Sequence, residues 1–154
     1  MKKFSFNLEK ILVYKDSILD KEKNALATIK GEKAQKEEEL TTMVNRLSVA
    51  FSDKDKSVLA GKSVLELMNH KYFIDDLKKQ IKAKKDEINL WTEKEEKQTK
   101  IVAECSKDVK RYEKLKEKKL EEYEKDIIKK DNEVISEFVS ISYVAKGREE
   151  ASNS

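Results

Sequence analysis

Few residues in this chain have the types and spacing that catalysis or metal binding requires. The sequence Gly-Lys-Ser at residues 61–63 is similar to the end of a phosphate-binding loop, but that motif needs a glycine where Lys56 stands, and a strand before it. His70 is the only histidine and Cys105 the only cysteine, and they lie far apart in the sequence. We therefore expect neither a histidine metal cluster nor a Cys-His pair, and we assign both residues structural roles.

The aromatic and acidic residues also lack a setting for chemistry. Trp91, Tyr112 and Tyr123 follow the spacing of an apolar helix stripe, where large rings pack into a thin core. Carboxylates are numerous, but a catalytic carboxylate needs a cleft that shifts its pKa, and a thin helical protein offers none. The sequence therefore predicts a protein that is not an enzyme and binds no cofactor and no metal.

The composition indicates which elements must position these residues. The 154 residues include no proline and three glycines, while 42% are charged and 38% are hydrophobic. An average chain of this length has roughly seven prolines and ten glycines, the residues that most often interrupt helices. The apolar content suits a narrow seam between helices better than a thick core. We therefore predict an all-α fold, a long antiparallel two-helix coiled-coil hairpin with a short bridging segment.

The charge distribution excludes several classes of partner. The formal net charge is +3, and acidic and basic residues are spread evenly along the chain, unlike the basic stripe that a nucleic acid requires. No stretch approaches the roughly 20 apolar residues of a membrane span, and the first residues do not form a signal-peptide core. We expect a cytoplasmic protein that binds no nucleic acid, and the single cysteine agrees with a reducing compartment.

The first helix is expected over about residues 4–51. Its periodicity ends at residues 52–57, a run of Ser, Asp and Lys, so we predict a bridge over 52–63. Ser63 and Glu66 match a capping box, which begins a second helix. The apolar positions of the first helix recur at steps of three, four or seven: Leu8, Ile11, Ile18, Ala25, Ile29, Leu40, Met43, Leu47 and Ala50.

The second helix is expected over about residues 64–145, with residues 147–154 as a disordered tail. The whole of residues 1–146 would form a single helical hairpin. Because the second helix is much longer than the first, pairing of the chain ends would make its early part overhang, with residues 52–70 folded back along it. Its seam positions are Ile74, Leu77, Ile81, Ile88, Trp91, Val102, Cys105, Val109, Tyr112, Leu115, Leu120, Tyr123, Ile127, Val134, Phe138 and Ile141.

Charged residues interrupt the seam of both helices. Two explanations are open: the long side chains extend past the apolar seam into water, or a partner completes these regions. The polar residues at or beside seam positions are Lys15, Glu22, Lys33, Lys36, Lys84, Glu95, Gln98, Lys116 and Lys119.

Several stretches of the chain match, in order, the sequence pattern of one known protein family. Residues 4–12, Phe-Ser-Phe-Asn-Leu-Glu-Lys-Ile-Leu, are similar to the F-x-F-x-L-E-x-[IV]-L start of that family. Residues 71–77 resemble its entry into the second helix, and residues 109–124, VKRYEKLKEKKLEEYE, its E-x-L-x-E-[KR] stretch. Residues 131–133, Asp-Asn-Glu, lie near where the family usually ends with Asp-Glu. On these matches the chain resembles the FliJ family, the small coiled-coil component of the flagellar type III export apparatus.

The resemblance implies a stalk that works by contact. Its paired ends would enter the ring of the export ATPase, and it would also bind the cytosolic domain of the export gate protein and export chaperones. It would lie in the cytoplasm, at most peripheral to the membrane, on the cytoplasmic face of the inner membrane at the flagellar base. The implied ATPase contacts are Phe4, Leu8, Leu12, Phe138, Ile141 and Tyr143. The implied gate contacts are Met43, Phe73 and Leu77, although Arg46, Ala50 and Lys84 depart from the pattern of some members.

Three other functions stay open. The chain could be the equivalent stalk of a virulence type III secretion system. It could be a structural spacer, which would need a second sustained apolar stripe for self-association. It could also be a holdase-type coiled coil, which would need apolar residues exposed at the helix tips and several chains that converge.

Overall fold

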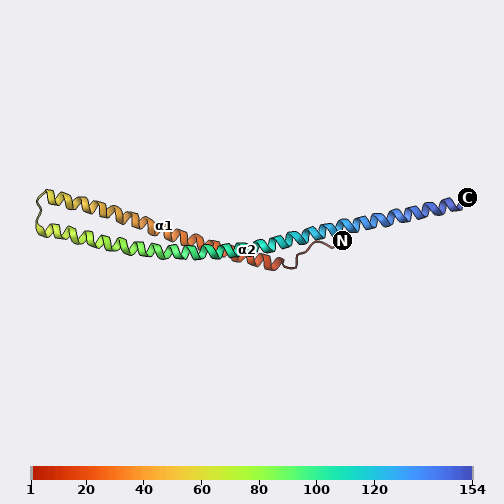
Figure 1. The fold of residues 1–154 in the computed structure, drawn as a ribbon, viewed down its shortest axis with the longest axis horizontal. Coiled ribbons are helices and arrows are strands. Elements are labelled where there is room, and N and C mark those ends of the chain that lie inside the picture. The colour runs from red at the N-terminus through yellow and green to blue at the C-terminus, as the bar shows by residue number, and fades with distance from the viewer. Residues whose placement is uncertain (1, 154) are drawn as a thin grey trace. The chain divides into compact units, whose positions relative to one another are not determined.

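Two long helices account for almost all of the protein. The computed structural model describes residues 2–153, in which α1 spans Glu9–Leu59 and α2 spans Val64–Ser152, with no strand in that range. The two helices are joined at residues 60–63 and run in opposite directions from that connection (Figure 1). The prediction of an all-α, two-helix hairpin is confirmed.

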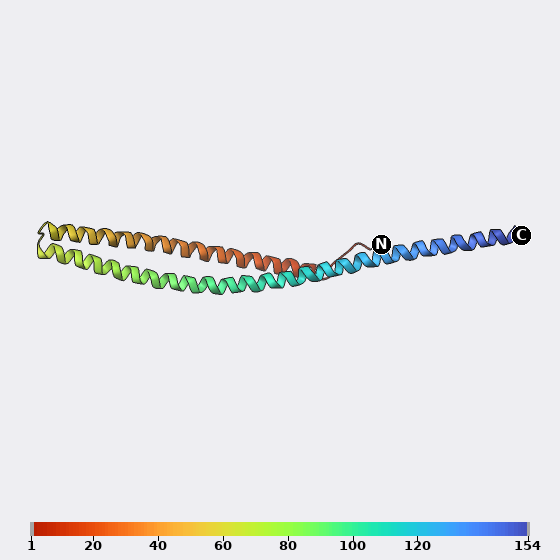
Figure 2. The same ribbon diagram turned by 45° about the horizontal axis from the view of Figure 1, so that its top comes forward.

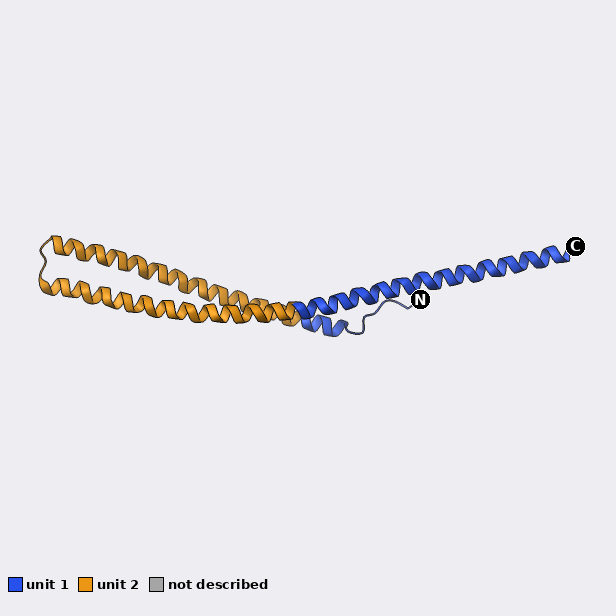
Figure 3. Ribbon diagram, viewed as in Figure 1, with its two compact units in different colours: residues 1–16, 107–154 blue, residues 17–106 orange. Residues whose placement is uncertain are grey.

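The chain divides into two compact units. One unit comprises residues 17–106, and the other combines residues 1–16 with residues 107–154 (Figure 3). The first consists of most of α1, the connection and the first half of α2. The second consists of the amino-terminal segment, the start of α1 and the second half of α2. We call them the hairpin unit and the terminal unit.

The connection in the hairpin unit is a compact helix stop followed by a helix start. Gly61 has a φ of 69°, a left-handed conformation that costs a glycine little. The amide of Lys62 donates to the carbonyl of Ser57 at 3.1 Å, and that of Gly61 donates to the carbonyl of Val58 at 3.2 Å. This pair of bonds is the Schellman motif that ends many helices.

A serine cap then begins α2. The hydroxyl of Ser63 accepts a hydrogen bond from the amide of Glu66 at 3.3 Å, as the capping-box pattern predicts. Both bounds of α1 differ from the expected range of about 4–51, because the helix begins at Glu9 and continues through residues 52–59. That run is polar but contains no residue that stops a helix, and Gly61 is the first position suited to a left-handed turn.

Cross-helix contacts define the register of the hairpin unit. Moving away from the turn, Glu39 faces Lys84, Lys36 faces Glu87, Lys33 faces Glu95, and Glu22 faces Gln98. The helices lie side by side along this stretch in both views (Figure 2). Because each helix is paired from the turn outward, the early part of α2 does not overhang, and residues 52–70 do not fold back.

The excess length of α2 lies at its carboxyl end, within the terminal unit. Residues 2–8 lie along residues 115–126, and every described residue from 128 to 153 is exposed. The expectation of a disordered tail differs from the structure, in which α2 continues to Ser152. Residues 147–152 include no proline, and a single glycine costs an exposed helix only about 1 kcal/mol.

Candidate partner-binding surfaces

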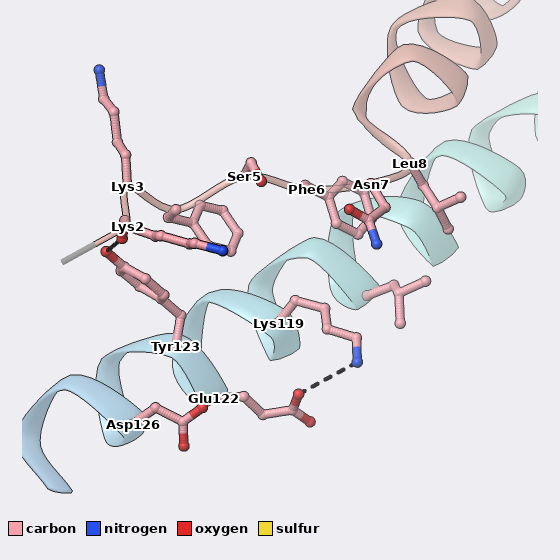
Figure 4. A pocket seen from close by; sticks show the side chains of 12 residues that line it. Lys2, Lys3, Ser5, Phe6, Asn7, Leu8, Lys119, Glu122, Tyr123 and Asp126 are labelled. Carbon is pink, nitrogen blue, oxygen red and sulfur yellow. Dashed lines mark hydrogen bonds and ion pairs between the residues drawn. The ribbon is translucent and has the colours of Figure 1, made fainter. Parts of the chain in front are cut away.

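The amino-terminal segment packs against α2 inside the terminal unit. The rings of Phe4 and Tyr123 lie 5.5 Å apart, and the Tyr123 hydroxyl donates to the carbonyl of Lys2 at 2.6 Å. Phe6, Leu8 and the α2 residue Leu115 line the adjoining groove (Figure 4). The segment therefore covers the apolar stripe of α2 as far as Tyr123.

Two implied ATPase contacts, Phe4 and Leu8, are half-buried in this packing, and the third, Leu12, is buried with 9% of its surface exposed. Between Leu8 and Leu12, Glu9 forms an ion pair of 2.8 Å with Lys116 of α2. These three side chains therefore pack within the terminal unit, and only parts of the first two are accessible to a partner.

The other three implied ATPase contacts lie beyond the region that the amino terminus covers. Phe138, Ile141 and Tyr143 are 70%, 69% and 80% exposed. The structure therefore does not bring them together with Phe4, Leu8 and Leu12. Their surroundings are unusual for this chain, because residues 134–145 contain a single charged residue, Glu137. A helix that is apolar around most of its circumference is typically enclosed by other chains or helices.

The implied gate contacts differ in accessibility. Phe73 is 55% exposed and lines two adjoining grooves of the hairpin unit, one with Val49 and Arg46 and the other with His70. Met43 is half-buried. Leu77 is buried at 4% exposure in a small core with Ala50, Ile74 and Leu47, so its side chain holds the two helices together.

The turn of the hairpin unit exposes a second apolar surface. These residues lie outside the seam periodicity, so the spacing of the apolar residues did not indicate them. On either side of the connection, Val58, Leu59, Val64 and Leu65 are each more than half exposed. Met68 and Tyr72 extend this surface along α2.

Ion pairs between helices account for most of the polar seam. In the hairpin unit, the Lys84 ammonium donates to Glu39 at 2.7 Å and to Glu87 at 3.1 Å, and Lys36 lies 3.3 Å from Glu87. Lys33 lies 3.1 Å from Glu95. The seam charges therefore neutralise each other across the hairpin, which neither of the two sequence-based explanations anticipated.

The hydrogen bonds of Lys84 shift the pKa values of this cluster. They hold the pKa of Glu39 below its usual range, as they do that of Glu87, which a bond from Lys36 lowers further. The two carboxylates in turn raise the pKa of Lys84. All three groups are therefore more strongly held in their charged forms than they would be in water.

The residues considered for chemistry have structural places. Residues 61–63 form the helix stop and cap, and the hydroxyl of Ser57 lies 2.9 Å from Nε2 of His70, joining the last turns of α1 to the second turn of α2. Cys105 is half-buried. Within residues 2–153, no group of three His, Cys, Asp or Glu residues could hold a metal ion. No helix in that range is long and apolar enough to cross a membrane.

These features define an α-helical hairpin with surfaces suited to protein contacts. The family model described as Flagellar FliJ protein matches residues 4–148, and the chain belongs to this family. It is therefore a component of the flagellar export apparatus, from a family of non-catalytic proteins. No curated protein and no solved structure shows significant similarity to the chain.

Proposed function

We propose that this protein is a stalk that links the flagellar export ATPase to the export gate. The carboxyl-terminal part of α2, with the amino-terminal segment, would enter the ATPase ring. The hairpin unit would bind the cytosolic domain of the gate protein. The protein would act in the cytoplasm at the flagellar base and would also bind export chaperones.

One observation carries the ATPase part of the proposal. Residues 134–145 form an almost uncharged helical stretch whose large side chains, including Phe138, Ile141 and Tyr143, are exposed. Leaving such a stretch in water is unfavourable by about 25 cal/mol for each Å² of apolar surface, so a surrounding partner is favoured. A ring pore encloses a single helix on all sides, which matches the wide apolar face.

The gate part of the proposal rests on Phe73. Its exposed ring lies between two grooves whose other lining residues include Arg46 and Asp53, so an aromatic anchor is surrounded by polar groups. This combination is typical of interface hot spots. Met43 would extend the contact, whereas the buried Leu77 would support it by holding the helices together.

The first experiment measures steady-state ATP hydrolysis by the cognate export ATPase, with the ring only partly assembled. The wild-type stalk should stimulate hydrolysis, and the double variant Phe138→Ser/Ile141→Ser should lose most of the stimulation. Both residues are exposed, so the variant should fold normally. Leu90→Ser/Ile101→Ser, which removes exposed apolar side chains from the hairpin unit, is the matched control and should stimulate like wild type.

Failure of the wild-type protein to stimulate or to co-elute with the ATPase would contradict the ATPase part. Equal stimulation by both double variants would place the contact elsewhere. The gate part is tested separately by titrating the gate domain with Phe73→Ser, which should bind at least about tenfold more weakly, since hot-spot residues contribute 2 kcal/mol or more.

The exposed apolar surface at the turn favours a second candidate function. Leu59, Val64 and Leu65 meet one of the two conditions for a holdase-type protein, apolar residues at the helix tips, because their side chains are 88%, 73% and 70% exposed. In this role the turn would hold unfolded export substrates. Suppression of the aggregation of a denatured test protein, abolished by Leu59→Ser/Leu65→Ser, would support it.

A further inference from the structure

Near the exposed end of α2, charged residues at mirrored positions on the two sides of a nearly uncharged stretch have opposite signs. Lys129 and Lys130 stand at one end of the stretch, and Glu149 and Glu150 at the other. Moving inward, the acidic Asp131 and Glu133 on the first side match the basic Arg148 and Lys146 on the second. Between these flanks lies the nearly uncharged stretch 134–145.

We infer that residues 129–150 pair, in antiparallel orientation, with the same residues of a second copy of this chain. Reversing one copy sets Lys129 level with Glu150, Lys130 with Glu149, Asp131 with Arg148, and Glu133 with Lys146. Because the arrangement has twofold symmetry, each of these oppositions occurs twice. A parallel pair would instead set every charge level with its own sign.

The apolar residues support the same alignment. Asp131, Val134, Phe138, Ile141, Ala145 and Arg148 follow each other at alternating steps of three and four, the spacing of a coiled-coil seam. In the alignment that matches the charges, Phe138 faces Ile141 of the second copy and Val134 faces its Ala145. Asp131 and Arg148 belong to both the charge pattern and this seam, and the apolar residues between them select the same register as the charges do.

The surface is free within the chain. The amino-terminal segment reaches only as far as the groove ending at Asp126, and each seam residue of the stretch is exposed. Val134, Phe138 and Ile141 are 65%, 70% and 69% exposed. A short two-helix interface is small, so we expect a reversible dimer with a dissociation constant on the order of 10 µM. This inference does not depend on the stalk function.

The test is sedimentation velocity of the full-length protein alone, from about 1 to 200 µM, a range that brackets the expected constant. The mass should rise from the 17.9 kDa of one chain towards twice that value. Asp131→Arg should weaken the dimer at least about tenfold, because it places two arginines together twice, and Arg148→Asp should do the same. The double variant Asp131→Arg/Arg148→Asp should restore association.

Helix content by circular dichroism should be equal in all four proteins, because both positions are exposed. A chain that remains monomeric throughout the range would overturn the inference. So would single variants that associate as wild type does, or a double variant no better than the singles, since either result would mean that these charges do not face each other.

Cross-linking tests the orientation. In a Cys105→Ser background, a chain with Val134→Cys is mixed with a chain carrying Ala145→Cys and oxidised mildly. Antiparallel pairing predicts a mixed disulfide, identified by mass spectrometry of the linked peptides. Disulfides of each variant with itself would indicate parallel pairing and contradict the inference.

Discussion

The two halves of the hairpin unit are held together by different forces. Near the turn, Ala50, Ile74 and Leu77 form a small apolar core in which each residue is at most 4% exposed. Farther from the turn, residues 22–39 and 84–98 contain no buried residue, and ion pairs such as Lys33 with Glu95 join the helices. The apolar core and the ion pairs therefore contribute differently to the stability of the hairpin unit and to its register.

Apolar contacts supply most of the stability, because burial of an aliphatic side chain stabilises by about 1.5–3 kcal/mol, while a partly exposed ion pair contributes at most about 1 kcal/mol. Charges, however, tolerate only one alignment. A shift of one helix turn would move Lys84 away from Glu39, and the charged side chains of the two helices would no longer lie opposite their ion-pair partners. The turn end therefore anchors the hairpin, and the middle specifies its register.

The largest effect should come from the apolar core. Leu77→Ala should lower the free energy of unfolding by about 3 kcal/mol, because it removes a buried side chain and leaves a cavity. Urea denaturation followed by circular dichroism measures the change. Leu90→Ala, at a position 59% exposed, is the control and should change stability by less than about 0.5 kcal/mol. Equal losses in the two variants would contradict the division between core and seam.

The glycines of the two regions should respond with opposite signs. Gly61→Ala should destabilise by about 1 kcal/mol, because alanine tolerates the left-handed turn conformation poorly. Gly31→Ala should stabilise by about 1 kcal/mol, because Gly31 lies inside α1 with no atom within 4 Å of an added methyl group. Thermal denaturation measures both, and changes of the same sign would show that φ does not govern these positions.

The cap at the start of α2 should have a smaller effect. Ser63→Ala removes the acceptor for the amide of Glu66 and should cost about 0.5–1 kcal/mol, while Ser63→Asp should retain most of the stability. Hydrogen exchange at the first turn of α2 provides the readout. Unchanged protection in Ser63→Ala would mean that water replaces the cap without loss.

Much of this architecture could be predicted from residue spacing. The lack of proline and the three-and-four periodicity indicate two helices, and Ser63 with Glu66 marks the start of the second. The end of α1 could not be predicted in the same way, because the loss of apolar periodicity at residue 52 removes packing but not helix propensity. The backbone stops only where Gly61 adopts a left-handed conformation.

The candidate sites were less predictable, because accessibility depends on register. Leu77 and Phe73 both fit the spacing of a helix that faces a partner, yet one is buried between the helices and the other is exposed. Likewise, Lys84 interrupts the apolar spacing of the seam, and only the register shows that it pairs with Glu39 on the other helix. Only the cross-helix alignment, which the ion pairs in the middle of the hairpin unit specify, distinguishes these cases.

The pH dependence should reveal the contribution of the charged seam. The hydrogen bonds of Lys84 lower the pKa values of Glu39 and Glu87 from their ordinary value of 4.5. A carboxyl group with a lowered pKa stabilises the fold above its ordinary pKa and loses that contribution as the pH falls through the folded value. Lys84 has a raised pKa, so its contribution is present below its ordinary value of 10.5 and is lost at higher pH.

The comparison of wild type with Lys84→Met isolates this effect. At about pH 7 the variant should melt at a lower temperature, because Glu39 and Glu87 lose their shared cation and repel each other. As the pH falls through the lowered pKa values of Glu39 and Glu87, both carboxyl groups become protonated, so the difference in melting temperature should narrow. Lys82→Met, at an exposed position of the same helix, should show no comparable pH dependence. A gap that stays constant from neutral to acid pH would show that Lys84 acts through the packing of its aliphatic chain, and the middle of the hairpin would then resemble its turn end.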